Sequence, residues 1–591
     1  MKDLVKEDKQ LWMILKGMIP IMILSNMATM LGSFVDGIVV GHGLGDQAMA
    51  AMGLCIPVTY LGTAISGIFS TGTQNRCASA VGNGDTDKAV RYFNTSMGFL
   101  FITGTVITVM ILLLTDPLSA LLGARGPHEN LKPDLMLYLK GIGLAIPFIC
   151  LTNTLSSLLY IEGRRKYALI AIAAGTAVNI IGDVIVAYVI HTGMLGIGLT
   201  TFLCYVVSSV ILLAQFTGET GRKSPLHFQL STFTPACFID IFNVGSSMAI
   251  VRICHMLRTW IINSILAALF TQAAITAFSI QNSLASLTTC VSVGAGAAAL
   301  TVGSVYAGEK NLTGMKNLMK MAVLWGVTLS LIVAVLCSLA RWPITDVFTD
   351  SHEVMRLAAN AFLGYLISLP MYSVNMVFMM YFQGIRRLKT AIVICIFDNL
   401  LFVCLAALIL SHTVGINGVW AAFPVGEVCT LIALVVMASV YHKRPVKGFE
   451  DLLQLPDDDE ICEYVFQSES LDEFLDKSTK AAEFACREGA DKKTALKISL
   501  CIEECGKNVM EWAFKEDEQP LLSVRLFRDN GKWIIYLKDM GKAFDPVAWL
   551  KENGNSPEVL RDHLGLHLVQ GMSSDMKYVP ALGTNTVIIT I

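Results

Sequence analysis

The sequence contains twelve long apolar runs between Leu11 and Tyr441, and none after residue 443. A helix needs about 20 apolar residues to cross the ~30 Å hydrocarbon core of a bilayer. We therefore predict an all-α polytopic membrane protein up to Tyr441, followed by a water-soluble domain. The predicted spans are 11–41, 47–74, 92–115, 134–160, 166–189, 194–217, 237–267, 272–300, 315–338, 356–382, 389–410 and 416–441.

Basic residues gather in every second loop between the predicted spans. Arg164–Lys166 follows the fourth span and Arg386–Lys389 the tenth, whereas loop 116–133 holds only two basic residues, Arg125 and Lys132. The positive-inside rule places the basic loops in the cytoplasm. Because the number of spans is even, both termini are expected there too.

The membrane part repeats itself at an interval of about 221–225 residues. Tyr160-Ile-Glu-Gly-Arg-Arg is answered by Tyr381-Phe-Gln-Gly-Ile-Arg-Arg, and a Gly-x-x-Gly turn at Gly193 by another at Gly415. Two six-helix bundles of one hand are typical of transporters that alternate access around a central cavity. The predicted divisions are a first bundle 1–220, a linker 221–236, a second bundle 237–442, a linker 443–459 and a soluble domain 460–591.

Four acidic residues lie inside predicted spans, where an ionisable side chain is costly and indicates a functional site. They are Asp36, Asp183, Asp398 and Glu427. Asn179 precedes Asp183 by four residues, so the two share a helix face. Such a carboxyl group can hold a proton, or bind Na⁺ when ionised. The alternative is that each acid sits at a helix end or only bonds a neighbour.

Three basic residues follow one another on a face of the seventh span, namely Arg252, His255 and Arg258. They are candidates to line the cavity of the second bundle together with Asp398, which would suit a purely cationic substrate poorly. The alternative interpretation is a local ion-pair network, or side chains that reach for the interface.

The membrane part resembles the multidrug and toxic-compound extrusion (MATE) family. The resemblance rests on the two like-handed bundles, the segment Val35-Asp36-Gly with Leu44-Gly45 after it, and the pair Asn179-x-x-x-Asp183. It implies a bacterial inner-membrane antiporter that expels organic cations and drugs in exchange for H⁺ or Na⁺. The residues that it implies for cation coupling are Asp36, Asn179, Asp183, Asn153 and Thr201.

Three motifs follow one another in the soluble part. Glu503-Glu504-x-x-x-Asn508 lies on a predicted helix, Asp539-x-Gly541 ends a predicted strand, and Gly565-Leu566-His567 opens a late helix. We predict helices at 470–489, 491–514 and 564–573, and strands at 521–528, 532–538, 575–579 and 585–591, which together form an α/β two-layer sandwich.

Each motif suits one part of a nucleotide. The carboxamide of Asn508 can bind Mg²⁺ beside a carboxylate that orients water or a hydroxyl. Asp539 can accept a hydrogen bond from an exocyclic amine such as adenine N6. Gly565 exposes backbone N–H groups to phosphate at a helix start. The three motifs together predict binding of ATP.

Residues 460–591 resemble the Bergerat-fold (GHKL) ATPases, and in particular the anti-sigma-factor serine kinases. The resemblance implies that Glu504 is the general base, that Asn508 holds Mg²⁺, and that Asp539 and Gly541 contact adenine. The residues that it implies around the phosphates and the base are Gly565, Leu566, His567, Gly583 and Thr584.

Two main hypotheses follow from the sequence; a third, transport powered directly by ATP, is disfavoured because the soluble domain has no P-loop. The first is an ion-coupled antiporter whose cytoplasmic ATP-binding domain regulates it or signals from it. The second is a membrane-anchored serine/threonine kinase or sensor whose transporter-like half binds ligand without moving it. Either would work in a lipid bilayer with a small-molecule ligand, and both allow a cytoplasmic regulatory protein as partner. No basic-aromatic patch indicates nucleic acid, and enzymatic turnover stays open.

Overall fold

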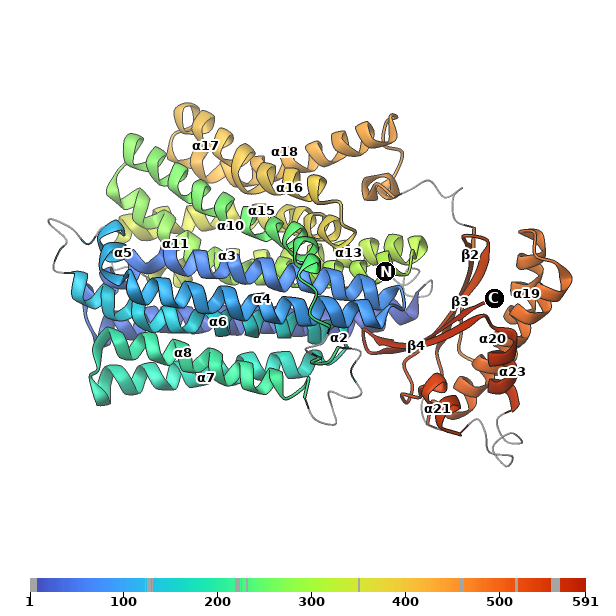
Figure 1. Cartoon of the computed structure of the whole chain (residues 1–591). Helices are drawn as coiled ribbons and strands as arrows, with labels where there is room; N and C mark the ends of the chain where they lie inside the picture. Colours follow the sequence, from blue (N-terminus) through green and yellow to red (C-terminus); the bar gives the residue numbers. More distant parts are fainter. Residues whose placement is uncertain are drawn as a thin grey trace.

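The computed structural model contains, in its described residues, twelve helices long and apolar enough to cross a membrane, which confirms the predicted number. The helical membrane domain is elongated, and the C-terminal domain lies against one end of it (Figure 1). The described residues are 8–122, 124, 129, 131–217, 224, 226–229, 232–348, 351–455, 462–515, 519–553 and 564–591.

The helices form the two predicted bundles. The first consists of α2 (Lys9–Gly43), α3 (Asp46–Gly82), α4 (Thr86–Leu113), α5 (Thr115–Leu121), α6 (Lys132–Ile161), α7 (Arg165–Ile185) with η2 (Val186–Ile190), and α8 (Gly193–Leu213). The second consists of α10 (Ala236–Leu269), α11 (Gln272–Thr288), α12 (Cys290–Gly308), α13 (Leu312–Leu339), α14 (Arg341–Asp346), α15 (His352–Gly384), α16 (Leu388–Ile396) with η4 (Phe397–Leu401) and α17 (Phe402–Thr413), and α18 (Ile416–His442).

The fifth long helix of each bundle contains a π-helical turn that the sequence does not reveal. In the first bundle this turn is η2, three residues beyond Asp183, and in the second it is η4, which contains Asp398. Such widened turns are rare and occur often at functional sites, because they re-aim the side chains around them.

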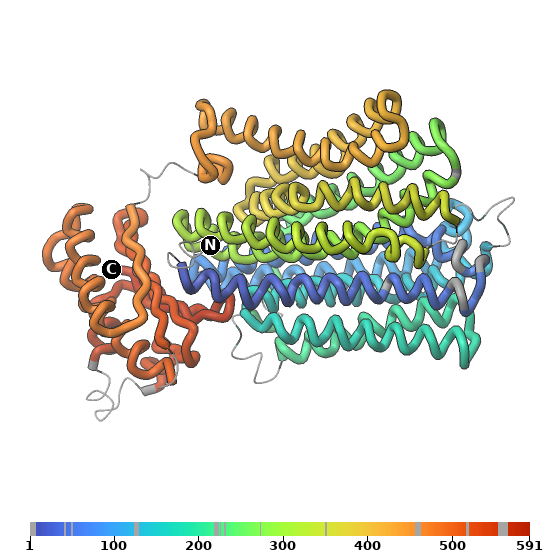
Figure 2. Tube along the Cα trace, turned by 180° about the vertical axis from the view of Figure 1, so that it is seen from behind, coloured from blue at the N-terminus to red at the C-terminus, as the bar shows by residue number. Residues whose placement is uncertain are grey.

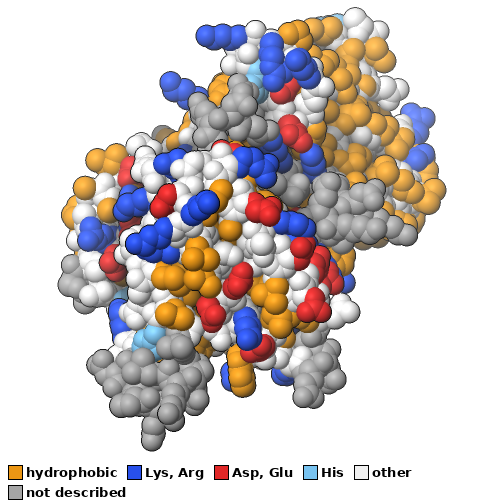
Figure 3. All heavy atoms as spheres, turned by 90° about the vertical axis from the view of Figure 1, so that its right-hand side faces the viewer, with side chains coloured by type: hydrophobic (Ala, Val, Ile, Leu, Met, Phe, Trp, Pro, Cys, Tyr) orange, Lys and Arg blue, Asp and Glu red, His pale blue; other side chains and the backbone are white. Residues whose placement is uncertain are grey.

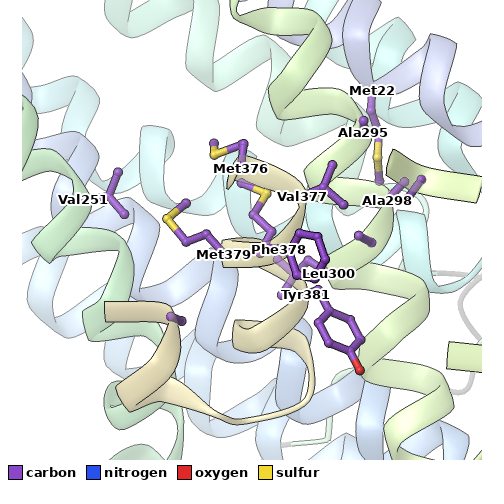
Figure 4. Packing of buried hydrophobic residues seen from close by; sticks show 14 of the residues in the cluster. Met22, Val251, Ala295, Ala298, Leu300, Met376, Val377, Phe378, Met379 and Tyr381 are labelled. Carbon is purple, nitrogen blue, oxygen red and sulfur yellow. The ribbon is translucent and has the colours of Figure 1, made fainter. Parts of the chain in front are cut away.

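The bundles pack against each other through small residues. A Cβ atom added to Gly245 of α10 would lie 2.0 Å from the backbone oxygen of Ile68 on α3. Figure 4 shows Met22 of α2 beside Ala295 and Ala298 of α12. Because lipid offers no hydrophobic gain for burying apolar surface, close packing of this kind is what holds membrane helices together.

The C-terminal domain is a five-stranded antiparallel sheet in the order β1-β2-β3-β5-β4. Its strands are β1 (Glu463–Ser468), β2 (Leu522–Asp529), β3 (Lys532–Asp539), β4 (Asp575–Ala581) and β5 (Thr584–Thr590). Its helices are α19 (Leu471–Arg487), α20 (Lys492–Trp512), α21 (Pro546–Asn553) and α23 (Leu564–Met572). The helices and the sheet form the expected two layers (Figure 1).

The hairpin between β2 and β3 turns at Asn530 and Gly531, as the sequence predicts. Both residues have positive φ, 49° and 81°, which is the geometry that favours Asn-Gly in a two-residue hairpin. Strand β1 and helix α21 were not predicted. Each is short, and β1 lies at the edge of the sheet, where its pattern of apolar residues is weak.

The face of the sheet without helices packs on the membrane domain. Phe527, Tyr536 and Ile588 belong to the same buried apolar cluster as membrane residues such as Leu158 and Val305. The back view shows the N-terminal end of α2 at this junction (Figure 2). Seen from the side of the C-terminal domain, acidic and basic side chains are mixed over that domain, and apolar ones dominate part of the bundle behind it (Figure 3).

The segment after α18 is folded up to residue 455 rather than extended. Arg444 makes two bonds of 2.8 and 2.9 Å with the carboxylate of Asp451 in η5 (Phe449–Leu453). Glu450 binds Lys320 of α13 at 2.8 Å, and Leu453 is fully buried. The predicted linker 443–459 is therefore attached to the membrane domain over its described part.

Candidate functional site

The first bundle contains a polar cluster around Asp183, which is fully buried on α7. Asn179 donates from Nδ2 to Asp183 Oδ2 over 3.2 Å, and the hydroxyl of Thr200 on α8 donates to Oδ1. Asp36 of α2 is a close neighbour of the same carboxyl group. Two neighbouring carboxyl groups in a buried site cannot both ionise at low cost. The pair is therefore suited to hold one exchangeable proton or another cation.

Glycine brings α2 close to α7 at this point. A Cβ atom on Gly32, one turn before Asp36, would lie 3.2 Å from Cγ2 of Thr176 and 3.7 Å from Oδ1 of Asn179. The next turn of α2 carries Asp36 towards Asp183. Oδ1 of Asp36 is buried and has no hydrogen-bond partner among the described residues. An unsatisfied buried carboxylate oxygen is the kind of atom that a coupling cation would satisfy.

The structure brings together Asp36, Asn179 and Asp183, but not Asn153 or Thr201. Asn153 Nδ2 donates to Ser66 Oγ over 2.8 Å, and the hydroxyl of Thr201 donates to the backbone oxygen of Ile197. Thr200 takes the place expected for Thr201. The sequence offers two adjacent threonines at this position. Consecutive helical residues point about 100° apart, so only one of the two faces Asp183.

The second bundle contains a matching acidic cluster. Asn375 of α15 donates from Nδ2 to Asp398 Oδ1 at 3.2 Å and to Glu427 Oε2 at 2.8 Å. Asn375 thus bridges the two carboxyl groups, and both acids are buried. Asn375 was missed in the sequence, because an uncharged amide in a long apolar helix carries no distinct signal.

The three basic residues of α10 have different surroundings. Arg258 Nη2 lies 3.3 Å from Nδ1 of His255, and its charge faces the pair formed by Asp398 and Glu427. His255 and Arg258 thus join the acidic cluster of the second bundle. Arg252 is half-buried, and it makes no hydrogen bond or ion pair in the part of the chain that the structure describes.

Helix α20 of the C-terminal domain presents its two neighbouring acids to different surroundings. Glu503 accepts hydrogen bonds from Ser478 at 3.2 Å and Ser499 at 2.9 Å, which ties it to the helical layer. Glu504 lies against Gly565 at the start of α23, where an added Cβ would be 2.0 Å from Oε2. Asn508 follows Glu504 by one turn and is half-buried. Glu504 and Asn508 therefore share a helix face near α23.

Asp539 ends β3 in a network that fixes one of its oxygens. Oδ1 accepts from the backbone N–H of Gly541 and from Asn585 Nδ2, each at 2.8 Å. Burial raises the pKa of Asp539, and these two bonds oppose the rise. Oδ2 makes no hydrogen bond within the described residues, so it is available to a donor such as an exocyclic amine.

The structure does not bring the remaining predicted nucleotide-binding residues together. Leu566 is buried in the core of the domain, while Nε2 of His567 is buried without a partner in the described chain. Thr584 donates to the backbone oxygen of Ala581, and Gly583 lies against Gly163 of the membrane domain. Because Asp539 pairs with Asn585 in the sheet, Thr584 points to the opposite face. Residues 554–563, between α21 and α23, lie outside the described residues.

Comparison with known proteins decides what the membrane domain is. The model of the MatE family matches residues 21–185 and 247–408, which is more than half of the chain. The chain belongs to the MATE family. The two matched segments contain the polar clusters described above, apart from Thr200 of the first bundle and Glu427 of the second.

Curated MATE relatives cover the membrane domain at low identity. The multidrug export protein MepA of Staphylococcus haemolyticus (strain JCSC1435) is 22% identical over 409 residues, which are 68% of this chain and 87% of MepA. MepA of Staphylococcus aureus (strain MSSA476) is 22% identical over 398 residues, 66% of this chain and 86% of its own.

Solved structures share the MATE fold. A multidrug resistance MATE family transporter of the MOP superfamily, in an outward-facing conformation, superposes with a TM-score of 0.67 at 23% identity, covering 71% of this chain and 93% of its own. A MOP superfamily transporter from Pyrococcus furiosus, described as having a binding pocket of reverse polarity, gives 0.65 at 24% identity with the same coverage.

The C-terminal domain also has a family match. Residues 477–591 match the model described as a histidine kinase-like ATPase domain. The MATE transporter is thus followed by an ATPase-like domain, and the match includes Glu504, Asn508 and Asp539.

Proposed function

We infer that this MATE transporter is an ion-coupled antiporter that exports organic cations or drugs across the bacterial inner membrane. The observation that carries the proposal is the pair of neighbouring acids Asp36 and Asp183 inside the first bundle, of which Asp36 has a buried oxygen with no partner among the described residues. In one state the pair holds a proton or Na⁺. Loss of that cation leaves two like charges in a buried site, which is unfavourable and drives a change in the helices around it.

The surroundings of the pair favour cation exchange. Asn179 and Thr200 fix Asp183 by hydrogen bonds, so Asp36 is the partner with an unsatisfied oxygen. Either H⁺ or Na⁺ suits this arrangement, since carboxylate and hydroxyl oxygens are ligands for both. A multidrug substrate is supported by the printed function of the MepA relatives, which are multidrug export proteins.

The ATPase-like domain would bind ATP and Mg²⁺ on the helical side of its sheet. Asp539 and Gly541 suit the adenine, Asn508 suits the metal, and Glu504 suits the role of base towards water or a hydroxyl. Bound ATP would supply a phosphoryl group. The basic loops support a cytoplasmic location for this domain and for both termini.

A regulatory rather than a driving role suits the domain best. Lys538, which binds Glu309 of the MATE domain, is the neighbour of Asp539 on β3. One strand therefore carries a contact to the transporter on one face and a nucleotide contact on the other.

The test is export of a fluorescent organic cation from an efflux-deficient bacterial host. We expect wild type to export, Asp36→Asn to fail at equal membrane level, and an ionophore to abolish export at constant ATP. Export that is unchanged in Asp36→Asn contradicts the assigned coupling site. Asp539→Asn is expected to change the rate without abolishing export, which reports regulation by nucleotide.

A membrane-anchored serine kinase or sensor is the second candidate. The placement of Glu504 beside Gly565, separate from the structural Glu503, favours a domain that retains catalytic geometry. Transfer of phosphate from ATP to a protein serine, lost in Glu504→Gln and accompanied by no export of any tested compound, would support it.

A further inference from the structure

The two MATE bundles are in close contact at the end next to the ATPase-like domain. A Cβ atom on Gly82 of α3 would lie 2.1 Å from the backbone oxygen of Val305 on α12, and one on Gly308 would lie 2.0 Å from that of Ser79. Backbones that approach so closely leave no path between the bundles here. The two bundles are therefore closed against each other at this end.

Polar contacts also join the two bundles along this line of close contact, which we call the seam. Asn75 of the first bundle donates from Nδ2 to Ser304 Oγ at 3.0 Å and to the backbone oxygen of Gly384 at 2.6 Å, both in the second bundle. Gln74 donates to Thr301 at 2.6 Å. All of these side chains are buried. A transporter that opens to this side must break each of these bonds.

The sheet of the ATPase-like domain binds the first bundle beside this seam. Tyr536 donates from its hydroxyl to the backbone oxygen of Gly82 at 3.2 Å. The backbone N–H of Leu582 donates to the oxygen of Ile161, the last residue of α6, over 2.5 Å. Ile588 packs where a Cβ on Gly84 would lie, 2.8 Å from its Cδ1.

The same face of the sheet binds the second bundle. Lys538 forms an ion pair with Glu309 at 2.6 Å, and their side chains are only 12% and 4% exposed. Arg525 donates to the backbone oxygens of Glu309 and Lys310 at 2.8 and 2.7 Å. Lys310 reaches back to Asp529 at 2.8 Å. Glu309 and Gly308 are neighbours, so the sheet holds the very turn that closes the seam.

We propose that the ATPase-like domain is a clamp that holds the cytoplasmic gate of the transporter shut. The domain bridges the two bundles at the point where they must part, and a rigid sheet cannot follow both bundles when they separate. Opening to the cytoplasm therefore requires the sheet to leave at least one bundle. The proposal rests on the proposed function for its cytoplasmic orientation and for the alternation of access.

The test measures the gate itself and does not depend on a substrate. Spin labels are introduced through an unnatural amino acid at Lys166 and Lys389, exposed residues at the gate ends of α7 and α16, because the chain has 15 cysteines. Distances are compared in lipid nanodiscs for wild type, for Lys538→Ala with Arg525→Ala, and for Lys480→Ala. Lys480 pairs with Asp476 on α19, so its variant is the matched control.

We expect one narrow distance distribution in wild type and in Lys480→Ala. The double variant is expected to add a longer-distance population and to raise the open-to-closed ratio about fivefold or more, which corresponds to ~1 kcal/mol. Hydrogen exchange at the Leu582 amide reports undocking separately. An undocked sheet with an unchanged distance distribution would overturn the clamp.

A second pair of variants guards against simple misfolding. Lys538→Glu is expected to release the sheet, and Lys538→Glu combined with Glu309→Lys to restore both docking and the narrow distribution. Gate opening in the variants without any export by wild type would contradict the proposed function and leave the clamp supported. If Lys538→Glu combined with Glu309→Lys does not restore docking, although hydrogen exchange in the rest of the chain shows that both variants are folded, the Lys538–Glu309 contact is not the basis of docking.

Discussion

Gly163 of the transporter and Gly583 of the ATPase-like domain face each other so closely that a Cβ on Gly163 would lie 2.2 Å from the backbone nitrogen of Gly583. Both residues have positive φ, 75° and 81°. We predict that Gly163→Ala separates the β4–β5 turn from the α6–α7 loop, because neither backbone can accept the methyl group. Exchange of the Leu582 amide should rise, as measured by hydrogen exchange and mass spectrometry.

Gly571→Ala is the matched control, since nothing lies within 4 Å of a Cβ at that position. It should leave exchange at Leu582 unchanged. Equal exchange in wild type and Gly163→Ala would show that the two turns are not in contact.

Substitutions at the two neighbouring threonines of α8 distinguish an effect on export from an effect on helix stability. Thr200→Val removes a hydrogen bond to the carboxylate of Asp183, and a bond to a charged group is worth ~1.5–3 kcal/mol. We expect export to fall about tenfold or more. Thr201→Val removes only a bond to the oxygen of Ile197 and should keep most of the activity. Initial export rates at matched protein level check this, and equal loss in both variants contradicts the assignment of Thr200.

The paired acids of α20 allow a similar comparison. Glu504→Gln should lower the rate of phosphoryl transfer or hydrolysis by a factor of ~10²–10⁴, the usual contribution of a general base, while ATP still binds. Glu503→Gln should lower thermal stability, because it weakens bonds to Ser478 and Ser499, and should spare turnover. Binding is measured with a fluorescent ATP analogue and turnover by phosphate release. Turnover by Glu504→Gln at the wild-type rate would exclude it as the base.

Stability should depend on pH through Glu162, at the end of α6. Burial raises the pKa of this carboxyl group to about 7, against a usual 4.5, and its bonds to Ser224 and Arg164 offset the rise only in part. The folded state then binds the proton more tightly than the unfolded state does. Stability from this group is full below pH 4.5, falls as the pH rises, and is lost above about 7.

Glu162→Gln should remove that part of the pH dependence and stabilise the protein at pH 8 relative to wild type. Thermal unfolding between pH 5 and 8 in one detergent measures it, with exposed Glu483→Gln as the control. Parallel pH curves for wild type and Glu162→Gln would contradict the role of burial.

Much of the fold was predictable because its signals are local. Apolar length determines the spans, and alternation with the Asn530-Gly531 turn determines the β2–β3 hairpin. The turn at Thr289 that divides predicted span 272–300 into α11 and α12 was not predictable, since no proline or glycine marks it. Short elements such as β1 depend on their neighbours in the sheet, which sequence periodicity does not reveal.

The candidate sites were predictable where charge is buried and less so elsewhere. Asp36 and Asp183 stand out because an acid in an apolar run is costly. Thr200 and Asn375 are uncharged and carry no such signal. Thr200 and Thr201 are adjacent, and the sequence does not show which of the two faces Asp183. Gly583 lies against Gly163 of the transporter, and this contact depends on how the two domains pack, which the motif alone does not reveal. A motif taken by itself points only to the chemistry of its own domain.

The apolar cluster that runs from the membrane helices into the sheet has a consequence for how this protein can be dissected. Phe527, Tyr536 and Ile588 would meet water if residues 462–591 were expressed alone. Such a fragment is expected to self-associate through that face, so activity measured on it describes an aggregate. The membrane helices precede the sheet in the chain, so the surface that covers these side chains is synthesised before the sheet is. Studies of the ATPase-like domain therefore need the membrane helices to be present.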